Sequence, residues 1–273
     1  MLKFVCWLVV WHTLLCLGIT IGYHRLLTHR SFQCPRWIEY AWVTLGWAAL
    51  MGPPISWVAV HRFHHANSDE VEDPHSPVHK GWWWSQVGWI AARAQERKLW
   101  MAGALADRAH DWPNSYDNDT PFMQKYAKDI HLNPYYRRLD FVNSLIFLAI
   151  TAGLMFLVGG WPAMLGRLVA ALTTMWVTWY VNSYAHTDGF GYRNFETRDA
   201  SRNVWWVALL TQGEGWHNNH HHRPLSARHG MRWWEFDLSW CVIRTMQALG
   251  LARKVYAYTY EQALDRKEVR TAA

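Results

Sequence analysis

Cysteine is scarce in this sequence, and its four occurrences are scattered: Cys6, Cys16, Cys34 and Cys241. Disulfide frameworks and zinc fingers need cysteines at short, recurring spacings, so the pattern argues against both and indicates free thiols. The sequence also lacks the glycine fingerprint of dinucleotide-binding folds and any segment typical of a haem-binding cytochrome. The chain therefore carries no nicotinamide- or haem-type redox module of its own. Internal repeats and low-complexity tracts are absent as well.

Apolar blocks alternate with strongly polar ones. Apolar residues make up 51% of the 273 positions and tryptophan occurs 21 times, yet the mean hydropathy is only −0.18. This combination predicts apolar segments separated by polar ones, and tryptophan favours membrane interfaces. The net charge is +6, with Lys and Arg beside the apolar segments. We therefore expect these basic residues to meet anionic lipid headgroups, and we expect no nucleic acid partner.

Three apolar stretches have about the length that crosses a membrane as a helix, at 4–23, 141–158 and 163–184. Only the turn at 159–162 separates the last two, which predicts a membrane hairpin. The first stretch is not typical of a signal peptide, because it is long and runs into a histidine motif without a small-residue cleavage site. The stretch at 37–50 is shorter and is closed by two prolines, so we expect an interfacial or re-entrant helix there.

The distribution of basic residues predicts which side of the membrane each end faces. The 159–162 turn has no Lys or Arg, whereas Arg25, Arg30, Arg36 and Arg62 lie near the other ends of the spans, which indicates that these ends are cytoplasmic. We therefore expect one all-α membrane domain over 1–273, whose polar segments form a helical cytoplasmic cap that holds the histidines. The cap is expected at 60–140 and 187–260, with an amphipathic helix over 234–255 and a frayed tail over 265–273.

Histidine is concentrated in four short motifs. Two blocks repeat the spacing HxxHH, and residues at i, i+3 and i+4 share a helix face, so each block is expected to point three imidazoles to one place. The nine imidazoles exceed the roughly four to six ligands of one first-row ion, which predicts two metals. The motifs are His24 with His29, His61 with His64 and His65, Asn182 with His186, and His217 with His220 and His221.

No cysteine lies near these motifs, so a structural zinc site is disfavoured, and imidazole-rich sites suit iron. Glu72-x-x-His75 and Glu214-x-x-His217 match the motif of soluble di-iron bundles as strings. Pro74 and the glycines beside Glu214 argue against regular helices there, so we do not expect carboxylate ligands from either. Of the remaining histidines, His12, His110 and His131 are expected to be packed or solvated, and no role is predicted for His75, His79, His222 and His229.

The motifs HRLLTH, HRFHH, NSYAH and HNNHH, together with the stretches 73–75, 81–89 and 213–216, resemble the membrane acyl desaturases that act at the ninth carbon. The resemblance extends from about 22 to 252. It implies that a cis double bond is inserted into a saturated acyl chain with dioxygen and two electrons. It further implies a multi-pass membrane protein with a cytoplasmic active site, an acyl-CoA or acyl-lipid substrate, and an external electron donor of the ferredoxin or cytochrome b5 kind.

The resemblance also implies roles for single residues. All nine motif histidines (His24, His29, His61, His64, His65, His186, His217, His220 and His221) would bind two irons, and Asn182 would reach one iron through water. Trp57, Thr178 and Trp179 occupy the positions that match the substrate-contacting residues of the family. Met51 stands where relatives often carry glutamine, which leaves the double-bond position open. The family has a further membrane helix before the first span, so we expect either a truncated start or a partner chain or lipid on that face.

Two other functions stay open. A di-iron hydroxylase would use similar irons, although hydroxylase relatives usually show HxxxH and HxxxHH spacings. A non-catalytic membrane protein could bind zinc, or haem between His12 and His24. These two histidines are about three helical turns apart, which disfavours their sharing one haem.

Overall fold

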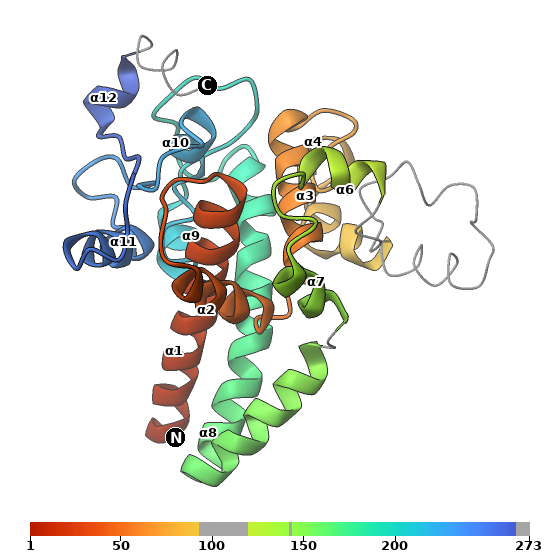
Figure 1. Cartoon of the computed structure of the whole chain (residues 1–273). Coiled ribbons are helices and arrows are strands. Elements are labelled where there is room, and N and C mark those ends of the chain that lie inside the picture. Colours follow the sequence, from red (N-terminus) through yellow and green to blue (C-terminus); the bar gives the residue numbers. More distant parts are fainter. Residues whose placement is uncertain (93–119, 142–143, 266–273) are drawn as a thin grey trace.

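The described part of the chain is all-α. The computed structural model describes residues 1–92, 120–141 and 144–265, and within these ranges it has helices and isolated bridges but no β-strand. Long helices form a stalk, and many short helices form a cap at one end of it (Figure 1). The predicted fold class, with membrane helices below a helical cap, is confirmed. His110 and residues 266–273 of the predicted tail lie outside the described residues.

The first stalk helix runs without a break through the predicted span. Helix α1 (Leu2–Leu17) continues directly into the wider π-helix η1 (Gly18–Thr28). Helix α2 (Arg36–Trp47) packs closely against η1. The two backbones are so near that a Cβ added at Gly18 would lie only 2.3 Å from the Gly46 nitrogen. Glycine at this position lets the two backbones approach, and it places α2 across the top of the stalk (Figure 1).

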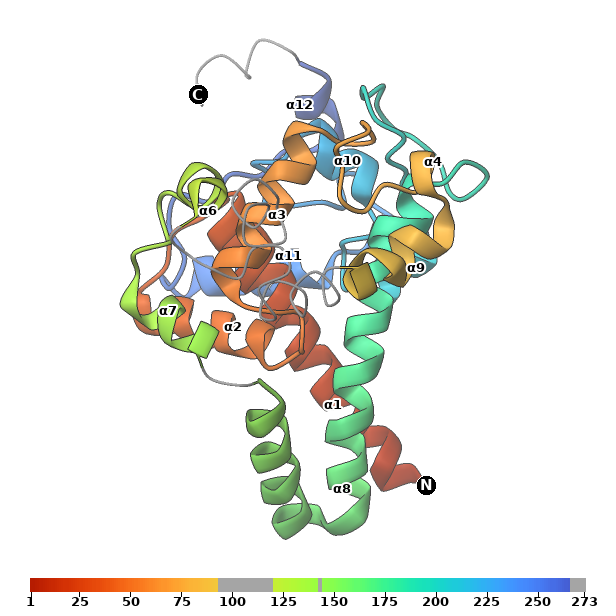
Figure 2. The same cartoon turned by 90° about the vertical axis from the view of Figure 1, so that its right-hand side faces the viewer.

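The rest of the stalk is a helical hairpin. Helix α8 (Ser144–Ser183) contains one residue with non-helical backbone angles, Gly160, at φ 65° and ψ −158°, and Pro162 follows it. The chain reverses there, so the two arms of α8 lie beside each other and beside α1 (Figure 2). Only 6% of the most apolar 18-residue window of α8 is buried. An apolar helix surface that the protein leaves uncovered is what a membrane helix presents to lipid.

Short helices make up the cap. The predicted amphipathic helix over 234–255 is wrong at both ends, because α11 spans only Leu238–Ala248. The Asp237 side chain accepts a hydrogen bond from the Trp240 amide and begins the helix, and Gly250 follows its end with φ 72°. The other cap helices are α3 (Pro54–Ala66), α4 (Pro77–Lys80), η2 (Trp84–Gly88), α6 (Pro121–Tyr126), α7 (Pro134–Phe141), η3 (Tyr184–His186), α9 (Trp205–Leu210), α10 (His217–His222) and α12 (Tyr260–Leu264).

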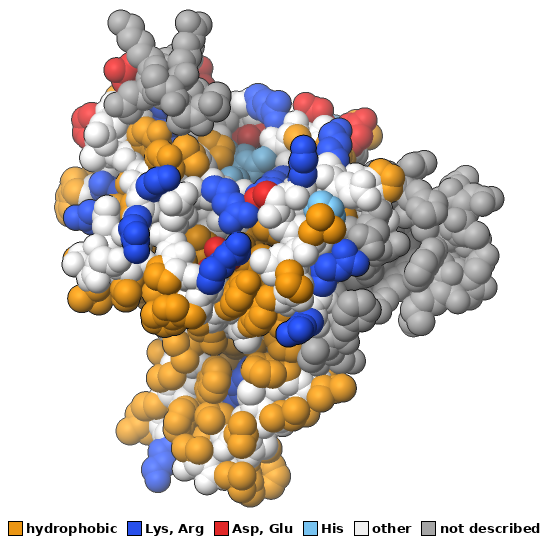
Figure 3. Space-filling view, in the orientation of Figure 1, with side chains coloured by type: hydrophobic (Ala, Val, Ile, Leu, Met, Phe, Trp, Pro, Cys, Tyr) orange, Lys and Arg blue, Asp and Glu red, His pale blue; other side chains and the backbone are white. Residues whose placement is uncertain are grey.

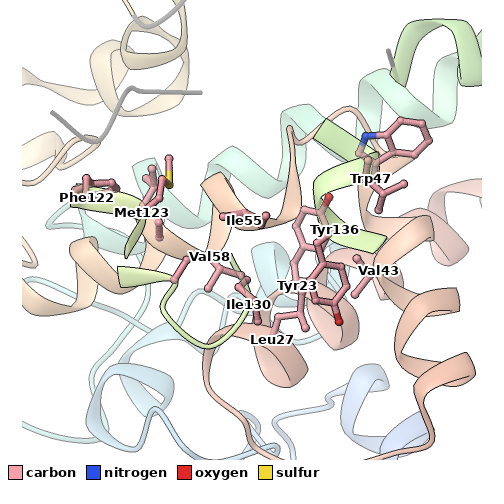
Figure 4. Close-up of a cluster of buried hydrophobic side chains, with 14 of the residues drawn as sticks. Tyr23, Leu27, Val43, Trp47, Ile55, Val58, Phe122, Met123, Ile130 and Tyr136 are labelled. Carbon is pink, nitrogen blue, oxygen red and sulfur yellow. The ribbon is translucent and has the colours of Figure 1, made fainter. Parts of the chain in front are cut away.

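A cluster of buried apolar side chains connects the cap to the stalk. It joins η1, α2 and α3 to α6 and α7, as Figure 4 shows. Because one side of α3 packs into this cluster, the helix is held firmly at the top of the stalk. Its labelled members are Tyr23, Leu27, Val43, Trp47, Ile55, Val58, Phe122, Met123, Ile130 and Tyr136.

The contact between η1 and α2 gives a stability prediction. We expect Gly18→Ala to lower the free energy of unfolding by about 1–3 kcal/mol, because the new methyl group meets backbone atoms of α2 that cannot move aside. The matched control is Gly153→Ala on α8, where nothing lies within 4 Å of the added Cβ. Thermal denaturation of both variants in detergent measures the difference. Equal stability of the two variants would show that α2 does not pack against η1 in this way.

Candidate metal centre

The HxxxxH motif lies on a π-helix, which explains its spacing. In an α-helix, residues five apart point in different directions, whereas the i→i+5 hydrogen bonds of a π-helix place them about one turn apart. The His29 amide donates to the His24 carbonyl at 3.1 Å, which is such a bond. The two imidazole ring centroids are consequently 4.8 Å apart. The sequence predicted that these histidines belong together but did not predict the helix type that brings them together.

The two HxxHH blocks lie on α3 and α10, but neither block points to a single place. Successive residues on a helix are about 100° apart, so His64 diverges from His65, and His220 diverges from His221. Each helix therefore contributes to two separate groups, and the prediction of three imidazoles converging per block is wrong. One group contains His24, His29, His61, His65 and His220, and the other contains His64, His186, His217 and His221.

Within each group the potential ligand atoms all lie within 4.8 Å of one another. In the five-histidine group, the Nε2 atom of His220 is 3.1 Å from that of His24 and 3.0 Å from that of His65. In the four-histidine group, the Nε2 atom of His217 is 3.0 Å from those of His186 and His221. The groups adjoin, since the rings of His65 and His221 stack with centroids 4.6 Å apart. The nine histidines thus form two neighbouring clusters of inward-facing nitrogens.

These separations fit metal ligands. Two nitrogens that are each about 2.1 Å from one ion are about 3.0 Å apart when they subtend about 90°, and about 3.4 Å apart in a tetrahedron. The observed separations of 3.0–3.1 Å are therefore close to those of nitrogens that share one metal ion. The Nε2 atom of His29 is buried and has no hydrogen-bond partner within the described ranges. A cation would supply the missing partner.

Burial favours the neutral form of several imidazoles in the groups, whereas at His186 the nearby Asp69 outweighs burial and raises the pKa. Desolvation, and then repulsion between neighbouring imidazoles, holds the pKa values of His61, His65, His217 and His220 well below the usual range. For His221, burial lowers the pKa to about 4 although Asp199 opposes the shift. A neutral imidazole has a free lone pair on one nitrogen, which is the form that binds metals. The environment therefore prepares the groups for a cation.

Four buried carboxylates orient the histidines from behind, and the sequence analysis missed their role. Each accepts a hydrogen bond from an Nδ1 atom, which leaves the Nε2 lone pair facing the group. Burial alone would raise the pKa of Asp69, but the charge of His186 and hydrogen bonds lower it to about 2, so this carboxylate is ionised. The pairs are Glu214 with His24 (2.5 Å), Asp73 with His64 (2.8 Å), Asp69 with His186 (2.8 Å) and Asp199 with His221 (2.7 Å).

Glu214 belongs to one of the two Glu-x-x-His strings. It lies in a turn outside the helices and contacts His24 on the Nδ1 side, opposite the nitrogen that faces the group. It also pairs with the fully buried Arg25 at 2.6 Å. Glu72 of the other string is exposed. Neither carboxylate therefore replaces a histidine in the groups.

The two asparagines inside HNNHH hold α10 in place. Asn218 accepts hydrogen bonds from the amides of Asn194 and Phe195, at 2.8 and 2.9 Å. Asn219 donates to Glu235 and to the His229 carbonyl, both at 2.8 Å. Both side chains are fully buried, so this six-residue helix is fixed by side-chain hydrogen bonds. The two asparagines between the histidines are visible in the sequence, but their role in holding the helix was not predicted.

The other histidines in the described part of the chain either lie beside the groups or bond elsewhere. His75 and His229 are buried beside the groups: His75 shares Asp73 with His64, and His229 lies near Glu214 and His24. His12 bonds to the Thr174 hydroxyl through Nδ1 and to the Leu210 carbonyl through Nε2, so neither of its nitrogens is free for haem. His79, His131 and His222 each bond to a backbone carbonyl away from the groups.

The predicted substrate residues lie next to the five-histidine group or on α8 below it. Trp57 stacks on His61, with centroids 4.9 Å apart, and Trp179 is buried in the cluster that backs α3. The Thr178 hydroxyl donates to the Thr174 carbonyl at 2.8 Å. Asn182 is half-buried on α8, one turn before His186, and is in neither histidine group. The roles of these residues stay predictions.

A cavity of about 520 Å³ opens from the cap surface toward both groups. His29 and His65 of one group and His221 of the other line it, so it reaches each of them. Figure 3 shows histidine side chains in a hollow of the cap, above the apolar stalk. Arg62 and Arg198 also line the cavity. Both histidine groups are thus accessible from the surface of the cap.

The sequence is similar to those of known proteins. A model of the fatty acid desaturase family matches residues 4–256. The sn-2 palmitoyl-lipid 9-desaturase of Nostoc sp. (strain 36) is 42% identical over 241 residues, which cover 88% of the chain and 76% of the relative. The sn-1 stearoyl-lipid 9-desaturase of Anabaena variabilis is 43% identical over 243 residues, with 88% and 78% covered. The acyl-CoA 5-desaturase of Anemone leveillei is 37% identical over 242 residues, with 87% and 67% covered.

The carboxylates behind the histidines give a metal-binding prediction. We expect Asp199→Ala to weaken binding of divalent metal about 10–100-fold, because His221 loses the partner that fixes its ring and its protonated nitrogen. Asp188→Ala is the matched control, since the Asp188 side chain is 86% exposed and pairs with Arg202 at the surface. Metal content after dialysis against a competing chelator is the measurement. If both variants retain metal equally, Asp199 does not support a ligand.

Proposed function

Because the chain belongs to the fatty acid desaturase family, we propose that it uses two irons and dioxygen to insert a cis double bond at the ninth carbon of a saturated acyl chain. The observation that carries the proposal is the pair of buried histidine groups with inward-facing Nε2 atoms about 3 Å apart, at the cap end of an apolar stalk. The nine histidines would be the iron ligands, and Asn182 would reach one iron through water.

The reaction removes two hydrogens from adjacent methylenes; dioxygen, two electrons and two protons are consumed, and two waters form. A bound iron pair would supply the oxidising power for this chemistry. The protein's own contribution is position and exclusion of water. Trp57, stacked on His61, places an aromatic surface beside the five-histidine group, and Trp179 adds a second buried ring. We propose that these residues and Thr178 hold the acyl chain near the irons.

The names of the relatives support a membrane glycerolipid as the acyl carrier. The two cyanobacterial relatives are 9-desaturases of sn-1 and sn-2 acyl lipids, whereas the Anemone relative acts on acyl-CoA at the fifth carbon. Carrier and position therefore vary among relatives. We propose the lipid-linked substrate and the ninth carbon, because the cyanobacterial relatives have the higher identities of the three.

We propose that the cap lies in the cytoplasm and that the protein crosses the membrane more than once. Arg25, Arg30, Arg36 and Arg62 lie at the cap end of the stalk, and the opposite end has the 159–162 turn without Lys or Arg. Gly159 at this turn lies near Trp7 of α1, so the start of α1 and the hairpin turn are at the same end. All nine histidines then face one compartment.

We propose that electrons enter through the cavity on the cap. It is lined by histidines of both groups, so a small redox protein docked over it would be close to each iron. A ferredoxin or a cytochrome b5-like protein would be the donor, and its acidic surface would complement the positive net charge of the chain.

A ligand variant tests the reaction. We expect His220→Ala to abolish desaturation in a host that lacks its own desaturase, because the five-histidine group loses a central nitrogen. His131→Ala is the control, since His131 is only partly buried and its ring bonds to the Lys128 carbonyl, outside both histidine groups. Gas chromatography of total fatty acids, with location of the double bond, is the readout, and the amount of protein in the membrane fraction checks insertion. Full activity of His220→Ala would contradict the ligand assignment.

The same host separates the desaturase from its nearest alternative. Hydroxylated acyl chains without new alkenes would identify a hydroxylase and overturn the proposal. Saturated lipids only, from a protein that carries metal and receives electrons from an added donor, would also contradict it.

Metal analysis gives a further prediction. The purified protein is expected to contain about two irons per chain, because the nine histidines divide into two groups. Elemental analysis by mass spectrometry measures this ratio. One zinc and no iron would favour a non-catalytic zinc protein, and an intense visible haem band would favour a haem protein.

A further inference from the structure

We propose that the segment 203–213 does not stand in the cytoplasm but enters the cytoplasmic leaflet, where the outer face of α9 meets lipid acyl chains. Sequence reasoning placed this segment within the polar cap at 187–260. The inference rests on the proposed membrane placement of the stalk. It adds a lipid-contacting element that follows the last span.

Hydrogen bonds to α1 report the depth of this segment. The Leu210 carbonyl lies 3.0 Å from His12 Nε2, and the Gln212 side chain donates to the Thr13 carbonyl at 3.2 Å. Both α1 residues lie in the middle of the first apolar stretch, roughly three turns before His24. The end of α9 is therefore well below the level of the histidine groups.

The depth of α9 measured along α8 agrees with the depth measured along α1. His12 also bonds to the Thr174 hydroxyl at 2.9 Å, and Thr174 is twelve residues before His186, or about 18 Å along a helix. At its other end α9 packs against the top of α8, where Trp206 contacts Tyr180 and Tyr184. The helix thus descends beside α8 from the cap toward the membrane interior.

The surface of the segment is apolar on its open side. Trp205 and Leu209, four residues apart on one face, are 64% and 65% exposed, and Leu210 is 40% exposed. No Lys, Arg, Asp or Glu occurs between 203 and 213. Exposing this face to water is unfavourable in proportion to its apolar area, whereas contact with acyl chains is not. The opposite face, with Val207 and Ala208, is buried against the protein.

Backbone groups at the lower end of the segment have protein partners, as the bilayer requires. His12 meets the Leu210 carbonyl, and the Gly213 amide donates to the Ala208 carbonyl at 2.8 Å. The Gln212 carbonyl accepts from the Ser239 hydroxyl at 2.9 Å, and this hydroxyl lies 2.7 Å from that of Thr20. This contact gives a structural role to His12, a polar residue within an apolar span: its side chain binds a backbone carbonyl at the end of α9.

The test measures the depth of α9 in phosphatidylcholine vesicles. A background is made with Cys6, Cys34 and Cys241 changed to Ser, which leaves the buried Cys16. Leu209→Cys in this background is labelled with a fluorescent maleimide. Quenching is compared between a lipid with a nitroxide at acyl carbon 5 and aqueous iodide. The controls are Ile150→Cys on α8 and Val78→Cys on α4, whose native side chains are 57% and 53% exposed.

We expect the label at 209 to be quenched by the nitroxide lipid at least half as strongly as the label at 150, and to be protected from iodide. The label at 78 should show the reverse. Strong lipid quenching at 150 with only iodide quenching at 209 overturns this inference and leaves the proposed function intact. Absent lipid quenching at 150 instead contradicts the membrane placement itself. Should Leu209→Cys fail to elute as a folded species, Trp205→Cys reports on the same face.

Discussion

The structure depends on one electrostatic constraint: nine imidazoles are packed into two groups, and the Nε2 atoms of seven of them lie 3.0–3.1 Å from a neighbouring Nε2 atom. Neutral imidazole nitrogens that present lone pairs to one another repel, and burial lowers the pKa values of His61 and His220 and so disfavours their protonation. A cation bound between the nitrogens would relieve this repulsion and give each buried polar atom a partner. The cap is best understood as the scaffold that keeps these nitrogens in place.

The scaffold controls each histidine from the side away from its group. Carboxylates hold four Nδ1 atoms, amides hold α10, and a π-helix turns His29 toward His24. The buried Arg25 joins two of these parts, because it pairs with Glu214 at 2.6 Å and with Asp237 at 3.1 Å. Asp237 also begins α11, so the charge behind His24 is connected to the outer helices of the cap. Such connected polar networks fix one arrangement more strongly than isolated contacts do.

Much of this arrangement could be predicted from the sequence, and the reasons for the remainder are specific. The apolar runs predicted α1 and the α8 hairpin because their length and the Gly160 turn are local properties. The histidine spacing predicted that the motifs belong together. It did not predict how each HxxHH block divides, because that depends on where α3 and α10 lie relative to each other. The roles of Asp69 and Asp199 were missed because their histidine partners are distant in the chain, and that of Asp73 because an irregular loop separates it from His64.

The division of α3 and α10 between both histidine groups has a mechanical consequence. Helix α3 gives two nitrogens to one group and one to the other, and α10 gives them in the opposite proportion. A rigid movement of either helix must therefore displace nitrogens in both groups at once. An ion held by one group would therefore restrain both helices and, through them, the nitrogens of the other group, so the two groups are mechanically coupled.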